Sequence, residues 1–310
     1  MQLSYLIAVI VGVSADLQRS TLPTCPDCGQ ICSVEFETKE KGHLYPLLRK
    51  KVNCDNIMRR MAFCPFQVIR PPPRKPPPDL LKDFTMDGSC VFGKPWYLDN
   101  SASSAPLRYP ASSFNSLLDR DRRGISINYY HDRNRFRLAL SKYLHAIAGK
   151  HVAVVGTEMP WAEATALNLG ARQVTTLEYR ELYIEDPRVS VFTPYQYAAK
   201  FLNRTSDTFD AVLSYSSIEH AGLGRYGDPL MPYGDMEAVA QIWCATKPGG
   251  YLFLALPLNR ANRTQCVLQW NALRWYSYFR MQHLTANFKV FEEISKLDGC
   301  NILYVLQKLQ

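Results

Sequence analysis

A short segment near residue 220 combines an acid, an imidazole and a glycine-rich loop. Glu219 and His220 are followed by the string AGLGRYGDP, which contains Arg225 and Asp228. Imidazole titrates near neutral pH, so His220 is a candidate general base for a hydroxyl group, with Glu219 or Asp228 orienting it. Arg225 is a candidate to grip an anionic or hydroxyl-rich group when the loop closes. The structural alternatives are that His220 caps the next helix and that Arg225 pairs with Asp228.

A second segment, residues 150–179, has the order expected for half of a nucleotide-binding unit. Val152–Val155 is an apolar run typical of a buried parallel strand, and Gly156 ends it where the chain must turn. A helix and a second strand are expected to follow. Glu178 lies at the end of that strand, where an acid can accept hydrogen bonds from both ribose hydroxyls of a nucleotide. The alternative is an ordinary crossover between parallel strands.

Strands and helices alternate through the rest of the chain. Strands are expected at 188–192, 209–215 and 251–256, helices at 136–148, 195–202 and 235–246, a long aromatic helix at 270–283, and closing strands at 288–294 and 302–307. Such alternation is typical of a doubly wound sheet. We therefore expect an α/β, Rossmann-like fold with a mostly parallel sheet and a terminal antiparallel hairpin.

Four strings make the interpretation narrower: PWAEATALNLGARQVTTLEY, SSIEHAGLGRYGDPLMPYGD, TKPGG and WNALRWY. They resemble the family catalogued as domain of unknown function 268, and the strand order resembles that of class I S-adenosylmethionine-dependent methyltransferases. The resemblance implies a methyltransferase-like fold and S-adenosylmethionine as cofactor, but no particular reaction. A hydroxyl-bearing small molecule or glycan is expected as substrate because of Glu178, the GLGRYGDP loop and the N-terminal leader. Under it, cofactor contacts are expected from Gly156, Thr157, Glu158, Glu178, Tyr179 and Ser216, and substrate contacts from Arg225, Tyr226, Asn271 and Arg274.

The chain also departs from the methyltransferase pattern. Val154 stands where an acid usually precedes the first glycine, G-T-E-M-P replaces a GxGxG turn, and Thr193 replaces the acid after the third strand. Where the family has His after WNA, this chain has Leu273. Trp161 is expected either to pack over the site or to be buried against the sheet. Two hypotheses follow: an O-methyltransferase, or a catalytically silent methyltransferase-like domain. A nicotinamide dehydrogenase is disfavoured because GxGxxG is absent.

The N-terminal segment is interpreted as a targeting sequence for the secretory pathway. Residues 1–15 contain the apolar run LSYLIAVIVGV and small residues before a cleavage after Ala15, as in a signal peptide. An uncleaved anchor is the alternative, and without it no stable membrane insertion is expected. Sequons at Asn203 and Asn262 agree with a lumenal or secreted location.

Six of the nine cysteines precede residue 91 and define a Cys-rich segment over residues 16–70 and just beyond: Cys25, Cys28, Cys32, Cys54, Cys64 and Cys90. In an oxidising compartment such a cluster usually forms disulfides. CPDCG resembles one half of a zinc ribbon, but no second Cys-x-x-Cys follows, so disulfides are preferred and no metal site is expected. Cys244 is expected to be a buried thiol.

The remaining boundaries follow from composition. PPPRKPPP opens a Pro-rich linker with wrapping loops over residues 71–113, and it is expected to act as an extended spacer. Residues 114–310 form the methyltransferase-like domain. The net charge of +8 comes from the first half of the chain. Because no nucleic-acid module accompanies it, a solvated basic face is preferred and no nucleic-acid partner is expected.

Overall fold

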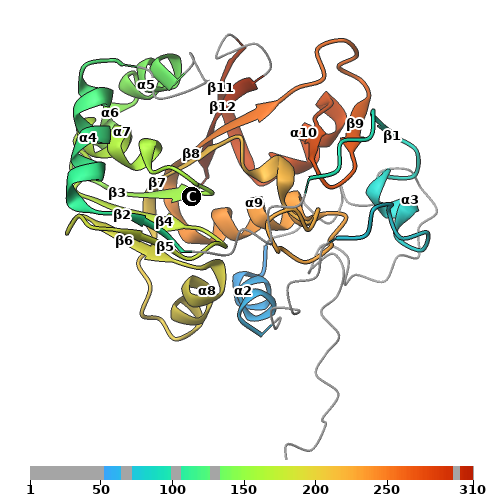
Figure 1. The fold of residues 1–310 in the computed structure, drawn as a ribbon, viewed down its shortest axis with the longest axis horizontal. Helices are drawn as coiled ribbons and strands as arrows, with labels where there is room; N and C mark the ends of the chain where they lie inside the picture. Colours follow the sequence, from blue (N-terminus) through green and yellow to red (C-terminus); the bar gives the residue numbers. More distant parts are fainter. Residues whose placement is uncertain (1–51, 64–71, 99–105, 126–132, 296–300, 310) are drawn as a thin grey trace, which may run out of the picture.

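The computed structural model describes residues 52–63, 72–98, 106–125, 133–295 and 301–309. Its main feature is a seven-stranded sheet of order β11-β12-β8-β7-β3-β4-β6 (Figure 1). These strands are β3 (His151–Val155), β4 (Gln173–Leu177), β6 (Val189–Phe192), β7 (Phe209–Tyr215), β8 (Thr246–Pro257), β11 (Phe288–Ile294) and β12 (Asn301–Lys308). β12 runs antiparallel to both of its neighbours, and the other pairs are parallel. This confirms the predicted Rossmann-like methyltransferase fold.

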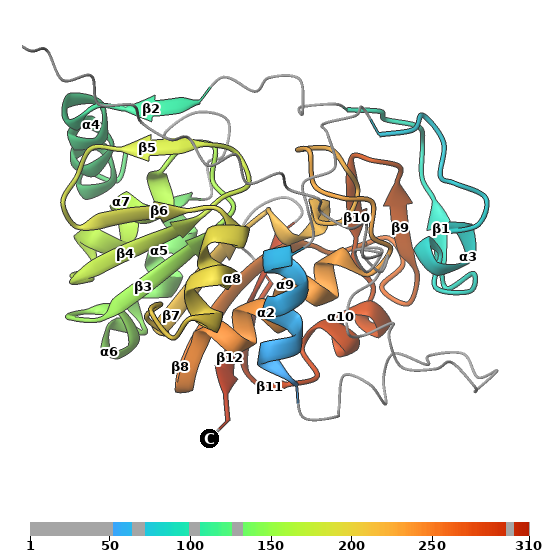
Figure 2. The ribbon, with the colours of Figure 1, turned by 90° about the horizontal axis from the view of Figure 1, so that it is seen from below.

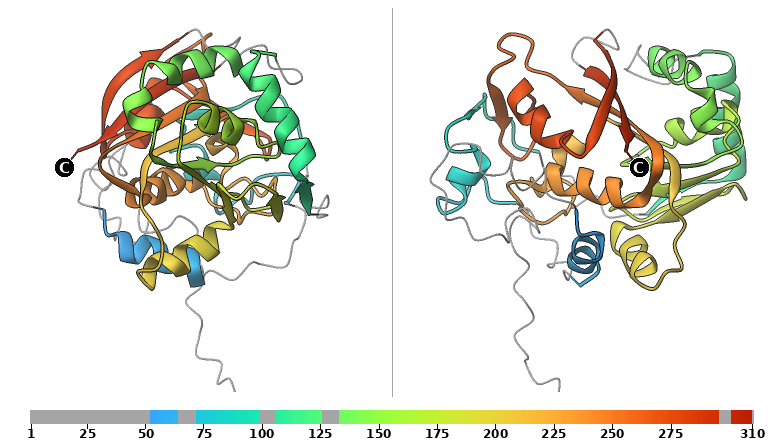
Figure 3. Two further views of the ribbon diagram at one scale, coloured as in Figure 1. Left: turned by 90° about the vertical axis from the view of Figure 1, so that its left-hand side faces the viewer. Right: turned by 180° about the vertical axis from the view of Figure 1, so that it is seen from behind.

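Two layers of helices cover the sheet (Figure 3). One layer contains α4 (Ala111–Arg122), α5 (Arg133–Ser141), α6 (Leu144–Ile147) and α7 (Trp161–Asn168), and the other contains α2 (Cys54–Phe63), α8 (Pro194–Leu202), α9 (Gly234–Ala245) and α10 (Tyr278–Leu284). Side chains alternate along β3, so Val152 and Val154 pack in the first layer and Ala153 in the second. The molecule therefore has a separate apolar core on each face of its sheet.

Local sequence explains where the helices begin and end. Gly170 follows α7 with φ +92°, a conformation that glycine adopts without strain. Thr193 caps α8, because its side chain accepts from the N–H of Gln196 at 3.2 Å while the Gln196 side chain accepts from the Thr193 N–H at 2.8 Å. Thr193 thus starts a helix at the position where methyltransferases usually carry an acid.

The prediction of a long helix at residues 270–283 is wrong. The segment instead contains β10 (Leu273–Trp275), paired antiparallel with β9 (Cys266–Gln269), and Ser277 then caps the shorter α10. β1 (Cys90–Phe92) completes a three-stranded sheet with them (Figure 2). Aromatic and apolar residues at this spacing suit a strand as well as a helix, which explains the error.

The segment expected to be loops also contributes regular structure. It contains α3 (Leu81–Phe84), β1 and β2 (Leu107–Tyr109), and β2 pairs with β5 (Leu182–Ile184). Two backbone carbonyls of the Pro-rich linker accept hydrogen bonds from side chains. The carbonyl of Pro72 accepts from the Tyr97 hydroxyl at 2.6 Å, and the carbonyl of Pro73 accepts from the Trp270 indole N–H at 2.7 Å. The described part of the spacer therefore lies against the domain.

Disulfides join the front of the chain to the domain. Cys54 of α2 is bonded to Cys244 of α9, and Cys90 of β1 to Cys266 of β9. The prediction of disulfides is confirmed for these front cysteines, whereas the expectation of a free thiol at Cys244 is wrong. The partners lie 190 and 176 residues apart in the sequence, so spacing alone did not indicate the pairing.

Some expectations fall on residues outside the described part of the chain, namely the leader, CPDCG, Cys64 and Cys300. Among the helices that are described, none has the length and apolar character needed to cross a bilayer. The described residues also contain no group of three or more side chains placed to hold a metal ion.

Candidate functional site

A cavity of about 690 Å³ opens at the carboxyl edge of the parallel strands. The turns after β3, β4 and β7 supply its polar wall, since Gly156, Glu178 and His220 all line it. Ligands of open α/β sheets bind at this edge. The structure therefore places the predicted cofactor residues and the predicted base on one cavity.

Gly156 makes the turn from β3 toward α7 with φ +74°. A Cβ atom at this position would collide with the side chain of Ser217, which follows β7. Glycine thus permits the left-handed backbone and lets the two turns pack together. The Ser217 side chain fills the space beside the turn.

Glu178 lies at the wall of the cavity with its carboxylate fixed by backbone groups. One oxygen accepts from the N–H of Thr157 at 2.7 Å, and the other accepts from the N–H of Arg180 at 3.0 Å. Burial raises the pKa of this carboxyl, and the backbone hydrogen bonds act in the opposite direction. A carboxylate has about four acceptor positions, so two remain for ligand hydroxyl groups.

The other residues predicted to contact the cofactor, Thr157, Glu158, Tyr179 and Ser216, also line the cavity. Ser216 has φ +49° and donates its hydroxyl to Glu219. Burial raises the pKa of Tyr179 well above its usual value, so its hydroxyl stays protonated. These positions therefore lie around one cavity, and the cofactor contacts expected from them stay a prediction.

His220 ends the short 3-10 helix η2 (Ile218–His220) and faces the cavity. Its Nδ1 lies 2.6 Å from the carbonyl oxygen of Ala272. Because a carbonyl only accepts, Nδ1 carries the hydrogen and Nε2 has a lone pair. Burial, and then the charge of Arg225, lower the pKa of His220 to about 4. The imidazole is therefore neutral at pH 7 and able to accept a proton.

The acids expected to orient His220 do not do so by hydrogen bonding. Glu219 Oε1 is 3.7 Å from His220 Nε2, too far for a hydrogen bond. Asp228 accepts instead from the backbone N–H groups of Gly222, Gly224 and Tyr226. The carbonyl of Ala272 orients the imidazole, and Asp228 shapes the loop.

Arg225 and Tyr226 project from that loop and line the cavity as predicted. The guanidinium of Arg225 lies 4.8 Å from the centre of the Tyr226 ring and 3.4 Å from the carbonyl oxygen of Ala272. A cation and a phenol hydroxyl therefore lie beside His220, where they can contact a polar acceptor molecule.

Asn271 and Arg274 are buried and lie outside the residues that line the cavity. Asn271 accepts from the Leu98 N–H at 2.8 Å and also donates to the Leu98 carbonyl. Arg274 donates to the carbonyls of Ala221 at 2.6 Å and Pro232 at 3.1 Å. Both residues hold backbone segments, so the substrate contacts expected from them are wrong.

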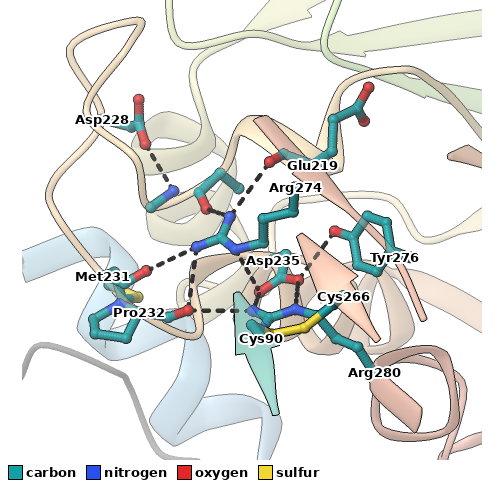
Figure 4. Close-up of polar contacts among 12 residues, drawn as sticks. Cys90, Glu219, Asp228, Met231, Pro232, Asp235, Cys266, Arg274, Tyr276 and Arg280 are labelled. Carbon is teal, nitrogen blue, oxygen red and sulfur yellow. Dashed lines mark hydrogen bonds and ion pairs between the residues drawn. A yellow bond between two sulfur atoms is a disulfide. The ribbon is translucent and has the colours of Figure 1, made fainter. Parts of the chain in front are cut away.

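Arg274 belongs to a buried ionic network beneath the glycine-rich loop (Figure 4). Asp235 accepts two hydrogen bonds from Arg280, at 2.7 and 2.8 Å, and one from the hydroxyl of Tyr276 at 3.0 Å. Burial alone would raise the pKa of Asp235, but the charges of Arg280 and Arg274 outweigh it and hold the pKa below its usual value. Pro232 accepts from both arginines. The network fixes both ends of the loop that carries Arg225 and Tyr226.

Several residues of the cavity were not predicted. Met58 and Met61 come from α2, and Gln241 comes from α9. No signal in the Cys-rich segment marked a helix that would reach the site. Trp161 lines the cavity and also packs edge-on against Tyr215 at 5.2 Å, so both of its expected positions are realised.

The chain was compared with family models, curated proteins and solved structures. Residues 149–303 match the model of a family described as "Caenorhabditis protein of unknown function, DUF268". No curated protein matches the chain. Among solved structures, a 1,6-didemethyltoxoflavin N1-methyltransferase from Burkholderia thailandensis is 17% identical, with 66% of this chain and 93% of that chain covered and a TM-score of 0.38. The N-methyltransferase NodS from Bradyrhizobium japonicum WM9 is 13% identical, with coverages of 58% and 99% and a TM-score of 0.35.

Proposed function

The chain belongs to the family described as Caenorhabditis protein of unknown function, DUF268, and for this member we propose S-adenosylmethionine-dependent methyl transfer. The acceptor in this proposal is a hydroxyl-bearing small molecule or glycan of the secretory pathway. One observation carries the proposal: a partly buried carboxylate, Glu178, and a neutral imidazole, His220, open onto the same cavity. The carboxylate can accept hydrogen bonds from the sugar of a nucleoside, and the imidazole can accept the proton of a hydroxyl group.

The residues at the cavity fit an adenosine-containing cofactor. Glu178 keeps acceptor positions for two sugar hydroxyls, and Thr157, Glu158, Tyr179 and Ser216 surround it. The adjoining wall is largely apolar, and Gln241 has a side-chain N–H group without a hydrogen-bond partner among the described residues. S-adenosylmethionine would supply an electrophilic methyl group here.

In this proposal the protein contributes alignment, exclusion of water and one proton acceptor. Methyl transfer is an in-line displacement, so most of the catalytic effect comes from positioning. His220 Nε2 takes the hydroxyl proton of the acceptor, while the Ala272 carbonyl holds the ring in the required tautomer. Arg225 and Tyr226 bind the polar groups of the acceptor. The network around Asp235 keeps their loop in place.

The location in the secretory pathway has two supports. Cys54–Cys244 and Cys90–Cys266 are disulfides, which persist in oxidising compartments. The sequon residues Asn203 and Asn262 are both exposed, so a glycan could be attached at either without unfolding the domain.

Titration calorimetry with S-adenosylhomocysteine, the demethylated product, tests the proposal. The oxidised protein is expected to bind it, and Glu178→Ala is expected to weaken binding by at least about tenfold through lost hydrogen bonds. Glu181→Ala, an exposed acid outside the cavity, serves as the matched control. Absence of heat with the unaltered protein at millimolar ligand would overturn the proposal.

A second candidate is a catalytically silent binding domain with the same fold. It is favoured by the filled turn at Gly156, where Ser217 packs, and by the two backbone N–H groups already bonded to Glu178. This candidate predicts no heat with S-adenosylhomocysteine. The same calorimetry therefore separates the two.

A further inference from the structure

The cavity continues beneath α2, which supplies two of its lining residues, Met58 and Met61. α2 packs against both α8 and α9 on the same face of the sheet (Figure 2). These three helices contribute an uncharged set of lining residues, which we call the α2 compartment: Met58, Met61, Pro194, Tyr197, Ala238, Gln241, Ile242 and Ala245. The charged lining residues belong to the turns at the other end, around Glu178 and His220.

Of the two polar side chains in the α2 compartment, one has a hydrogen-bond partner among the described residues and the other has a donor group without one. The Tyr197 hydroxyl already donates to the carbonyl of Asp207 at 2.9 Å. Gln241 Nε2 is buried and has no hydrogen-bond partner in the described part of the chain. A buried amide N–H without a partner is destabilising because no hydrogen bond compensates for the loss of its contact with water. An acceptor atom on a ligand would relieve this in an otherwise apolar space.

We propose that the α2 compartment binds a flat, uncharged nitrogen heterocycle, with Gln241 donating a hydrogen bond to a ring nitrogen. Met58 and Met61 line the compartment from α2. Their thioether side chains make favourable contacts with aromatic rings, which suits a flat heterocycle. The absence of charge from the compartment walls excludes an anionic or cationic group there. In this proposal α2 is part of the binding site and helps to determine which ring the site accepts.

This inference rests on the proposed function and deepens it. The heterocycle belongs either to the nucleobase of the cofactor or to an aromatic acceptor molecule. Calorimetry with adenine, quinoline and S-adenosylhomocysteine distinguishes them. Adenine that competes with S-adenosylhomocysteine identifies the nucleobase. Quinoline that binds together with S-adenosylhomocysteine identifies the acceptor.

Two substitutions test the compartment itself. Met61→Trp fills it and is expected to weaken heterocycle binding at least about tenfold, and Gln241→Met removes the donor and is expected to weaken binding about fivefold. Arg59→Trp places the same bulky side chain on the exposed face of α2 and is expected to change nothing. Thermal unfolding midpoints show whether each variant is folded.

The outcomes separate this inference from the methyltransferase proposal. If adenine or quinoline binds and Met61→Trp abolishes it, the inference stands even when S-adenosylhomocysteine produces no heat. If adenine, quinoline and S-adenosylhomocysteine all bind folded Met61→Trp and Gln241→Met as they bind the unaltered protein, the inference is overturned while the cofactor proposal survives. Failure of every heterocycle to bind at millimolar concentration also overturns it.

Discussion

His220 is kept neutral by its surroundings and has no acid hydrogen-bonded to Nε2. Desolvation and the neighbouring charge of Arg225 disfavour the imidazolium, and the Ala272 carbonyl selects the tautomer. A base of this kind has a constant protonation state over the whole physiological pH range. Any activity that depends on it should therefore lack the inflection near pH 6.5 that an exposed histidine gives.

Titration of His220 by NMR tests this arrangement. We expect a pKa of about 4, and Arg225→Leu should raise it toward the usual value of 6.5 because the repulsive charge is removed. His220→Asn identifies the signal. A pKa near 6.5 in the unaltered protein, or no upward shift in Arg225→Leu, would contradict the assignment.

Glu163 gives a second prediction at this scale. It is fully buried on α7; its Oε1 accepts from Thr176 at 2.8 Å, and its Oε2 has no hydrogen-bond partner among the described residues. Burial raises its pKa to about 7, so the folded state holds a proton that the unfolded state loses near pH 4.5. Its contribution to stability is therefore lost as the pH rises from about 4.5 to 7.

Glu163→Gln removes this pH dependence. Between pH 4.5 and pH 8, the free energy of unfolding of the variant should rise by about 3 kcal/mol relative to that of the unaltered protein. Chemical denaturation at the two pH values measures it, with exposed Glu181→Gln as the control. An equal difference at both pH values would show that Glu163 is ionised throughout.

The sequence predicted the site best where one residue type is required. A turn after a buried strand needs glycine, and an acid at the end of the next strand has few other uses, so Gly156 and Glu178 were found. Asn271 and Arg274 were misassigned because their polar groups bond to backbone carbonyls and amides far away in sequence, which residue spacing does not indicate. Met58 and Met61 carry no pattern that distinguishes a cavity wall from a core.

At the scale of elements, α2 is the least expected part of the site. Its sequence is short and polar on one side, and its placement depends on packing against α8 and α9 and on a disulfide to a cysteine 190 residues away. Local propensity cannot predict such long-range contacts. In contrast, the strands of the main sheet from β3 to β7, and the helices α7, α8 and α9, were predictable, because each is bounded by glycine, proline or polar turns and has a clear apolar pattern. The short β5 between them was not predicted.

Cys54→Ser tests how α2 is held. Loss of the disulfide should lower the free energy of unfolding by about 2–4 kcal/mol and should also weaken adenosine binding, because α2 is then held only by packing and surface ion pairs. Cys90→Ser is the matched control, since neither Cys90 nor Cys266 lines the cavity. Equal affinity in a folded Cys54→Ser protein would show that packing alone fixes α2.

At the scale of the whole molecule, N-linked glycosylation tests the proposed location in the secretory pathway. Expressed from Met1 in eukaryotic cells, the chain should carry N-linked glycans on the exposed Asn203 and Asn262 if the proposed secretory location is correct. Mass spectrometry before and after enzymatic deglycosylation measures them, with Asn203→Gln and Asn262→Gln as controls. An intracellular, unmodified chain with reduced cysteines would contradict a secretory location.

In the proposed function, the Glu178 carboxylate at the end of β4 accepts hydrogen bonds from the hydroxyl groups of a nucleoside sugar. Calorimetry with adenosine and 2′,3′-dideoxyadenosine, on the unaltered protein and on Glu178→Ala, measures that contact directly. We predict that the unaltered protein prefers adenosine by about tenfold and that Glu178→Ala loses the preference. Equal affinity of the unaltered protein for the two nucleosides would contradict the account.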